Sequence, residues 1–162
     1  FDAKSASRAF ATPRSWSFVS ELIEEPMDDT TATDLIAGTV GEGLAVKFQA
    51  HRKIAGKLPN PTDVLAGKVA KLEVQEVSAM YSLTISMCYE LKEALGKVKD
   101  AEFHKMSDNF FRFMMDNFET ELVVMGARIA LTTYAIPFQP TKLKNFDEFH
   151  QRYGKYILAS QG

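Results

Sequence analysis

An arginine in the first turn of a predicted helix is the residue of this sequence best suited to chemistry. Thr12 is a good N-cap for that helix, and Pro13 fits its first position because the N–H that proline lacks would be unpaired there. Arg14 follows, and its guanidinium donors suit phosphate oxygens at a helix end that already favours an anion. On local physics alone, an exposed ion pair with Glu21 or Asp2 is the simpler interpretation.

Three closely spaced glycines resemble a phosphate-binding loop only superficially. They form the pattern Gly38-x-x-Gly41-x-Gly43, but no Lys-Ser or Lys-Thr follows them and no strand precedes them. The Walker A pattern G-x-x-x-x-G-K-[ST] occurs nowhere in the sequence, and no apolar strand ends in Asp-Glu. We expect the glycines to lie in a helix over residues 31–55 and to admit a second helix at close range. That contact would offset the cost of about 1 kcal/mol per glycine in a helix interior.

Metal and thiol chemistry have little support in the sequence. His51, His104 and His150 lie far apart, and none has a second ligand at a spacing typical of zinc sites, so we predict no metal site. Cys88 is the only cysteine and lies in the apolar run of residues 85–89. The sequence therefore predicts an unreactive core thiol in a reduced, cytoplasmic protein.

The charge balance argues against nucleic acid and membranes as partners. The 162 residues carry 19 Lys+Arg and 21 Asp+Glu, a formal net charge of −2. Lysines are concentrated only in residues 92–105, where acids alternate with them, whereas a phosphate backbone needs several unopposed cations on one face. The longest stretches without charge, residues 77–89 and 129–141, fall short of the roughly 20 apolar residues of a membrane span. A nucleic-acid binder built on a short helix at residues 62–66 is accordingly the least favoured alternative.

Helical periodicity runs along most of the sequence. Apolar residues recur at spacings of three or four, the segments are bounded by caps, proline or glycine, and the best alternating pattern covers only residues 71–75. We predict an all-α bundle of six or seven helices, with a capping box formed by Asn145 and Glu148. The predicted helices cover residues 13–25, 31–55, 62–66, 78–97, 100–118, 122–134 and 146–158.

A stripe of Phe and Met over residues 103–118 has two interpretations. Methionine-rich surfaces can adapt to different partners, which would make the stripe a docking groove. Its helical period and the polar residues on the opposite side of the helix favour a place in the core instead.

Several of these segments together resemble the C-terminal lid region of MoxR-like AAA+ ATPases of bacterial and phage type. The matching blocks are FATPRSW (residues 10–16) followed by Val19-Ser20, GTVGEG (38–43), Phe48, KLPNP (57–61) and AMYSL (79–83). The likeness covers residues 9–92, and residues 100–162 match no part of the family. The resemblance implies a lid-like helical subdomain over residues 1–97 and a helical C-terminal extension over residues 98–162.

The resemblance also implies a role for Arg14. In these ATPases the arginine of the Pro-Arg pair is the sensor-2 residue, which reaches from the lid to the terminal phosphate of ATP. Arg14 takes that role here, with Thr12 beside it at the nucleotide. The implied cofactor of the full-length protein is Mg-ATP, and the implied partners are an upstream ATPase subdomain, further copies in a homo-oligomeric ring, and a protein client that hydrolysis remodels.

Two consequences and one rival function follow. Because the Walker motifs are absent, this chain should not hydrolyse ATP alone. Because it begins at Phe1 without an initiator Met or a secretory leader, we expect residues upstream of it. The alternative function is a stand-alone helical adaptor that uses no nucleotide and docks a partner protein through the Phe/Met stripe.

Overall fold

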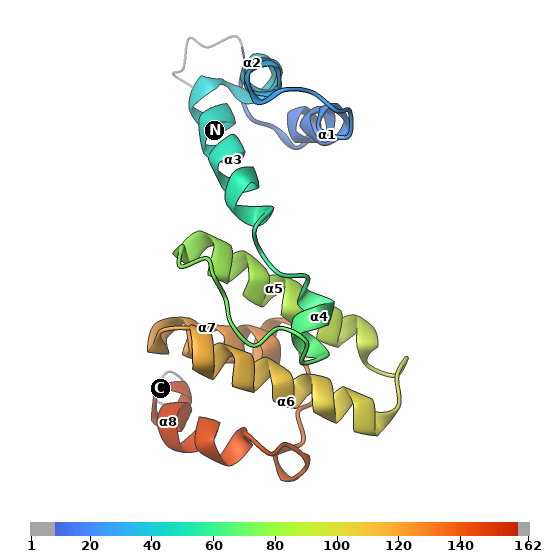
Figure 1. Ribbon diagram of the computed structural model, residues 1–162, viewed down its shortest axis with the longest axis vertical. Coiled ribbons are helices and arrows are strands. Elements are labelled where there is room, and N and C mark those ends of the chain that lie inside the picture. Colours follow the sequence, from blue (N-terminus) through green and yellow to red (C-terminus); the bar gives the residue numbers. More distant parts are fainter. Residues whose placement is uncertain (1–8, 159–162) are drawn as a thin grey trace. The chain divides into compact units, whose positions relative to one another are not determined.

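The structure, a computed structural model, describes residues 9–158, and every regular element in that range is helical. The all-α prediction is therefore confirmed. The α-helices of this range are α1 (Pro13–Leu22), α2 (Asp29–Val40), α3 (Glu42–Ala55), α4 (Pro61–Leu65), α5 (Val77–Ala94), α6 (Asp100–Asn117), α7 (Thr120–Arg128) and α8 (Phe146–Leu158) (Figure 1). A π-helical turn, η1 (Ile129–Thr133), extends α7, and a 3-10 turn, η2 (Pro140–Lys142), precedes α8. Within residues 9–158, no helix combines the length and the apolar character needed to cross a membrane.

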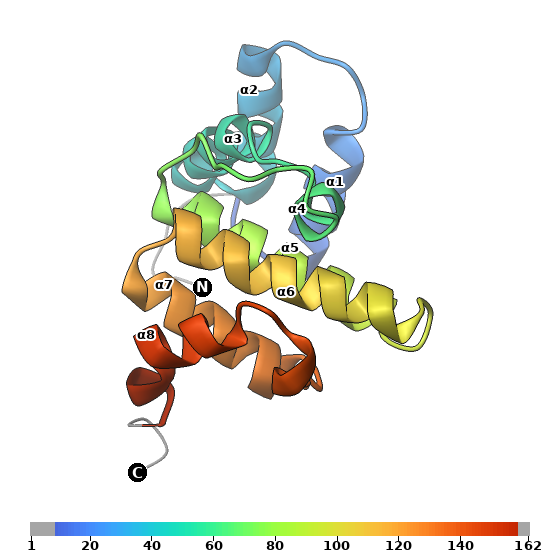
Figure 2. The ribbon, with the colours of Figure 1, turned by 60° about the horizontal axis from the view of Figure 1, so that its bottom comes forward.

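The chain divides between Gly56 and Lys57, and not at residues 97 and 98 as predicted. Unit 1 is Phe1–Gly56 and contains α1 to α3, while unit 2 is Lys57–Gly162 and contains α4 to α8. The predicted boundary is wrong because α5 and α6, which flank it, pack against each other and against α4 and α7 (Figures 1 and 2). The turn between α5 and α6 thus connects two parts of one core.

Residues 31–55 form two helices where one was predicted. Gly41 ends α2 and begins α3 with φ 97° and ψ 150°, a backbone conformation that glycine adopts without strain. A Cβ there would also lie 3.3 Å from the carbonyl oxygen of Ala9. The predicted close approach of another helix is wrong for Gly38 and Gly43, since a Cβ at either meets no described atom within 4 Å.

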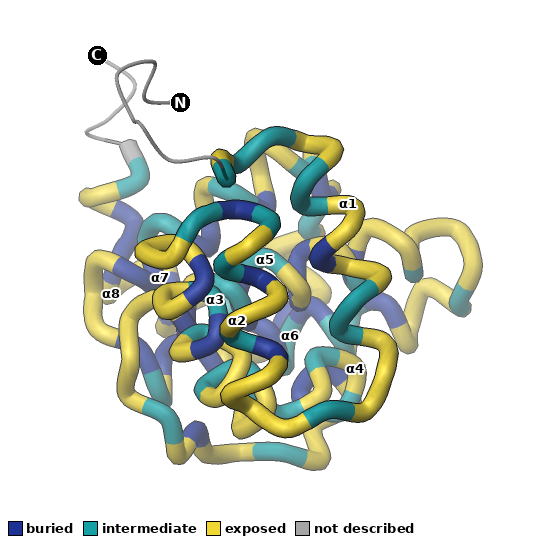
Figure 3. The backbone as a smooth tube through the Cα atoms, turned by 90° about the horizontal axis from the view of Figure 1, so that it is seen from above, coloured by how far each residue is buried: buried dark blue, intermediate teal, exposed yellow. Residues whose placement is uncertain are grey.

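Unit 1 has a small core made by one face of each of its helices. Every fourth residue of α2 is buried, at Ala32, Ile36 and Val40. Figure 3 shows buried segments of this helix separated by intermediate and exposed ones. Trp16 of α1 packs on Phe48 of α3 with ring centroids 5.2 Å apart. This spacing places the polar face of α2 in solvent and its apolar face against α1 and α3.

The Phe/Met stripe of α6 forms the centre of the unit 2 core, as predicted. Phe110, Phe111 and Met114 are fully buried, and the centroid of the Phe111 ring lies 4.5 Å from that of Phe149 in α8. The core prediction for the Cys88 thiol is confirmed as well: Cys88 is fully buried, and this burial raises the pKa of its thiol to about 12.

Polar side chains on α6 hold two extended segments against the helix. The Asn117 side chain accepts a hydrogen bond from Leu72 N (2.7 Å) and donates to the carbonyl oxygens of Ala70 (3.0 Å) and Phe113 (2.9 Å). The Asp108 carboxylate accepts from the backbone N–H and the side-chain amide of Asn145 at 2.8 and 2.9 Å. The Asn145 amide group therefore binds α6, and the predicted capping box with Glu148 is not among the hydrogen bonds of the described residues.

Replacing Asn117 with alanine is expected to destabilise unit 2 by about 1–3 kcal/mol, because it removes three hydrogen bonds and leaves backbone groups of the connector before α5 without partners. Urea unfolding followed by far-UV circular dichroism measures the change. The neighbouring D116A substitution removes only an exposed ion pair with Arg112 and is the matched control. Equal stability of N117A and D116A would contradict the assigned role of Asn117.

Candidate functional site

The first turn of α1 is fixed by a reciprocal pair of hydrogen bonds. Thr12 Oγ1 accepts from the backbone N–H of Ser15 at 3.0 Å, and Ser15 Oγ accepts from the backbone N–H of Thr12 at 2.7 Å. Pro13 occupies the first helical position, as the sequence predicts. This capping box determines the direction in which the helix begins, and therefore where the Arg14 backbone lies.

Arg14 itself is exposed and carries no charge partner among the described residues. Its guanidinium makes no ion pair within 4.0 Å in the part of the chain covered by residues 9–158, so the predicted alternative of a pair with Glu21 is not formed. Asp2, the other predicted partner, lies outside the described residues. Arg14 thus presents a positive charge without an ion-pair partner among residues 9–158. This charge lies at the end of a helix whose dipole favours an anion.

An open hollow of about 440 Å³ lies beside Arg14, entirely within unit 1. It is lined by Ala9, Phe10, Thr12, Arg14, Ser15, Phe18, Gly38 and Thr39. Two sequence blocks that suggested the AAA+ resemblance, residues 10–16 and 38–43, therefore meet at one surface. Both residues predicted for the site, Thr12 and Arg14, border this hollow.

Some of the polar side chains that line the hollow already make hydrogen bonds within unit 1. Thr12 Oγ1 serves the helix cap, and Thr39 Oγ1 donates to the carbonyl oxygen of Leu35 at 2.8 Å. The Arg14 guanidinium is the group best placed to take up a new anion, while Thr12 fixes the turn that presents it. Direct contact between Thr12 and a nucleotide stays a prediction.

Phe18 and Thr39 line the hollow although neither was assigned to the site from the sequence. Phe18 lies one helical turn after Arg14 on α1 and is half exposed. Its position four residues after Arg14 could have placed it at the site, since residues at that spacing share a helix face. Thr39 had no such signal, because its place depends on how α2 packs against α1.

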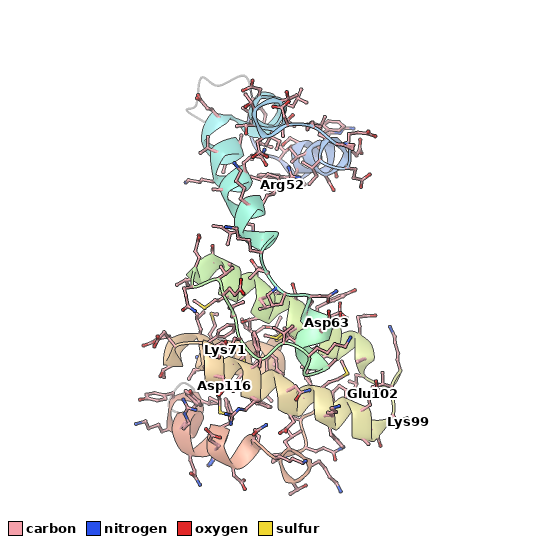
Figure 4. All side chains as sticks on the ribbon, in the orientation of Figure 1. Arg52, Asp63, Lys71, Lys99, Glu102 and Asp116 are labelled. Carbon is pink, nitrogen blue, oxygen red and sulfur yellow. The ribbon has the colours of Figure 1, made fainter. Side chains whose placement is uncertain are left out.

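A second hollow, of about 560 Å³, lies in unit 2 between α4, α5 and α6 and has charges of both signs. Asp63 and Glu102 lie on α4 and α6 at its rim (Figure 4). Asp63 pairs with Lys68 at 2.8 Å, and Glu93 pairs with Lys97 at 2.5 Å. Within residues 9–158 no three His, Cys, Asp or Glu side chains converge as metal ligands would. This mixture of acids and bases favours neither a cation nor an anion.

Comparison with protein-family models, with curated proteins and with solved structures finds no match to this chain. The structural observations that bear on function are therefore those of the Arg14 hollow and of the exposed apolar surfaces.

Proposed function

We propose that this chain is the helical C-terminal region of a MoxR-like AAA+ ATPase, in which Arg14 contacts the terminal phosphate of ATP bound by an upstream subdomain. The observation that carries the proposal is the exposed Arg14 guanidinium, which has no ion-pair partner among the described residues and stands in the first turn of a capped helix. The hollow beside it supports the proposal, because two of the blocks that resemble the family border it together.

The proposed mechanism is a change in the position of the lid that follows the state of the nucleotide. While ATP is bound, Arg14 and the positive end of α1 attract the terminal phosphate and favour one lid orientation. Hydrolysis and phosphate release remove that attraction, so the favoured orientation changes. In a homo-oligomeric ring, this movement would act on a protein client. Mg-ATP is the cofactor of the full-length enzyme, and the upstream subdomain holds its phosphate chain.

ATP hydrolysis by the isolated 162-residue chain is expected to be undetectable, because the chain lacks both Walker motifs. The experiment compares phosphate release by this chain with release by the full-length protein that contains it, at the same molar concentration. Turnover confined to the full-length protein supports the proposal. Hydrolysis or tight ATP binding by the chain alone would show that the nucleotide pocket is assigned to the wrong place, and a full-length protein without ATPase activity would refute the proposed function.

The second candidate, a helical adaptor without nucleotide, needs a docking face other than the one first proposed. The Phe/Met stripe of α6 is buried in the unit 2 core and is not available to a partner. One observation still favours an adaptor: Val77, Tyr81 and Tyr89 of α5 are 63%, 45% and 53% exposed and recur at multiples of four residues. Such a stripe suits a partner helix. A full-length protein that neither binds nor hydrolyses ATP would shift support toward this candidate.

A further inference from the structure

A groove of about 680 Å³ runs along the outer face of α7 and continues over the π-helical turn η1. Val124, Met125 and Ile129 supply its apolar part, and Tyr156 of α8 forms one side. Its remaining lining residues are Thr120, Glu121, Arg128 and Thr132. All of these residues belong to unit 2, so the groove is complete within one unit.

The charges of the groove stand at its two ends. Glu121 and Arg128 are seven residues apart, which places them on one helix face but separates them by about 10.5 Å along the axis. Neither makes an ion pair within residues 9–158. The groove therefore has an apolar centre with an unpaired acid toward one end and an unpaired base toward the other.

We propose that this groove is a self-association surface, on which α7 of a second copy of the chain packs in the antiparallel direction. A two-fold axis near Val124 and Met125 would bring Glu121 of each copy opposite the other copy's Arg128. Such an interface is self-complementary, since the same patch serves both copies. A parallel arrangement would instead place like charges together at both ends.

Two further charges lie on elements next to the groove. Lys155 of α8 lies over the Tyr156 ring, with its Nζ 4.7 Å from the ring centroid, at the side of the groove. Glu119, the N-cap residue of α7, is a second acid at the same end of the helix as Glu121, but it does not line the groove. Because α7 has only nine residues, the contact is small, and the association is weak and reversible.

Sedimentation of the 162-residue chain over a range of concentrations tests the proposal. The wild type should show a monomer–dimer equilibrium, and both E121R and R128E should raise the dissociation constant by about tenfold or more, since each places like charges in both symmetry-related contacts. The double variant E121R/R128E restores both pairs and should return the constant to within about threefold of wild type.

The double variant also shows whether the substitutions change the dissociation constant through the proposed contact or for another reason. Glu121 and Arg128 make no ion pair with each other within one chain, so rescue of one substitution by the other points to a second copy. E102R, an exposed charge reversal on α6, is the matched control and should leave the dimer unchanged. A wild type that stays monomeric at every concentration, single variants without effect, or a double variant as weak as the singles would each overturn the proposal.

Discussion

Replacing Phe111 with alanine is expected to lower the free energy of unfolding of unit 2 by about 3–5 kcal/mol. The Phe111 side chain is 1% exposed, and its ring packs against three rings from outside α6, those of Phe138, Phe146 and Phe149, with centroids 4.8, 6.0 and 4.5 Å away. These rings come from the segment before η2 and from α8, so the cavity left by alanine would open between α6 and the C-terminal part of the unit. A typical domain has only about 5–15 kcal/mol of stability to lose.

The measurement is urea unfolding of the full chain followed by far-UV circular dichroism, with F111L as an intermediate substitution. Leucine fills part of the cavity and should recover roughly half of the loss. Y89A is the matched control, because Tyr89 is an aromatic residue of the same unit that is 53% exposed. It should change stability by no more than about 0.5 kcal/mol. An F111A variant as stable as Y89A would contradict the assignment of Phe111 to the core.

The sequence best predicted structural features that depend only on residues close together in the chain. The stripe on α6 was predictable because a helical period of apolar residues needs no knowledge of distant contacts. The cap at Thr12 was predictable for the same reason, since its partners lie within three residues. The break at Gly41 was not, because a glycine inside a helical pattern is compatible with continuation as well as with a cap. Only the packing of α2 and α3 on each other distinguishes these outcomes.

Long-range hydrogen bonds determine much of what the sequence could not reveal. Asn117 binds Leu72 across 45 residues, and Asp108 binds Asn145 across 37, without any periodic signal in the sequence. The predicted boundary near residue 97 was wrong for a related reason: glycine and charged residues mark a turn, but not whether the helices on its two sides share a core. At the candidate site, the place of Arg14 in the first turn of a capped helix could be predicted from that turn alone, whereas the hollow required α2 to bring Thr39 beside it.

Replacing Arg14 with alanine in the full-length protein is expected to lower ATP turnover at saturating ATP by about 10³-fold or more, the range for arginines that offset charge on the transferring phosphate. R14K should recover part of the activity, because lysine keeps the charge but lacks the planar fork of donors. Thr12→Ala should cause a smaller loss, since it removes only the hydroxyl that caps the turn carrying Arg14.

Substitution of Arg52 is the control for the loss of one positive charge. Arg52 is an exposed arginine of α3 in the same unit (Figure 4). Its Nη1 donates a hydrogen bond to Gln49 Oε1 at 3.1 Å. R52A removes the same guanidinium from the last turn of α3 and should leave turnover within about twofold of wild type, as expected of a residue without contact to the transferring phosphate. Far-UV circular dichroism of both variants checks that the helical content is preserved.

The most direct test of the central claim is therefore the turnover of R14A against R52A in the full-length protein, at saturating ATP and equal helical content. The proposed lid function predicts a loss of about 10³-fold or more in R14A and wild-type turnover in R52A. Equal turnover in the two variants would contradict it.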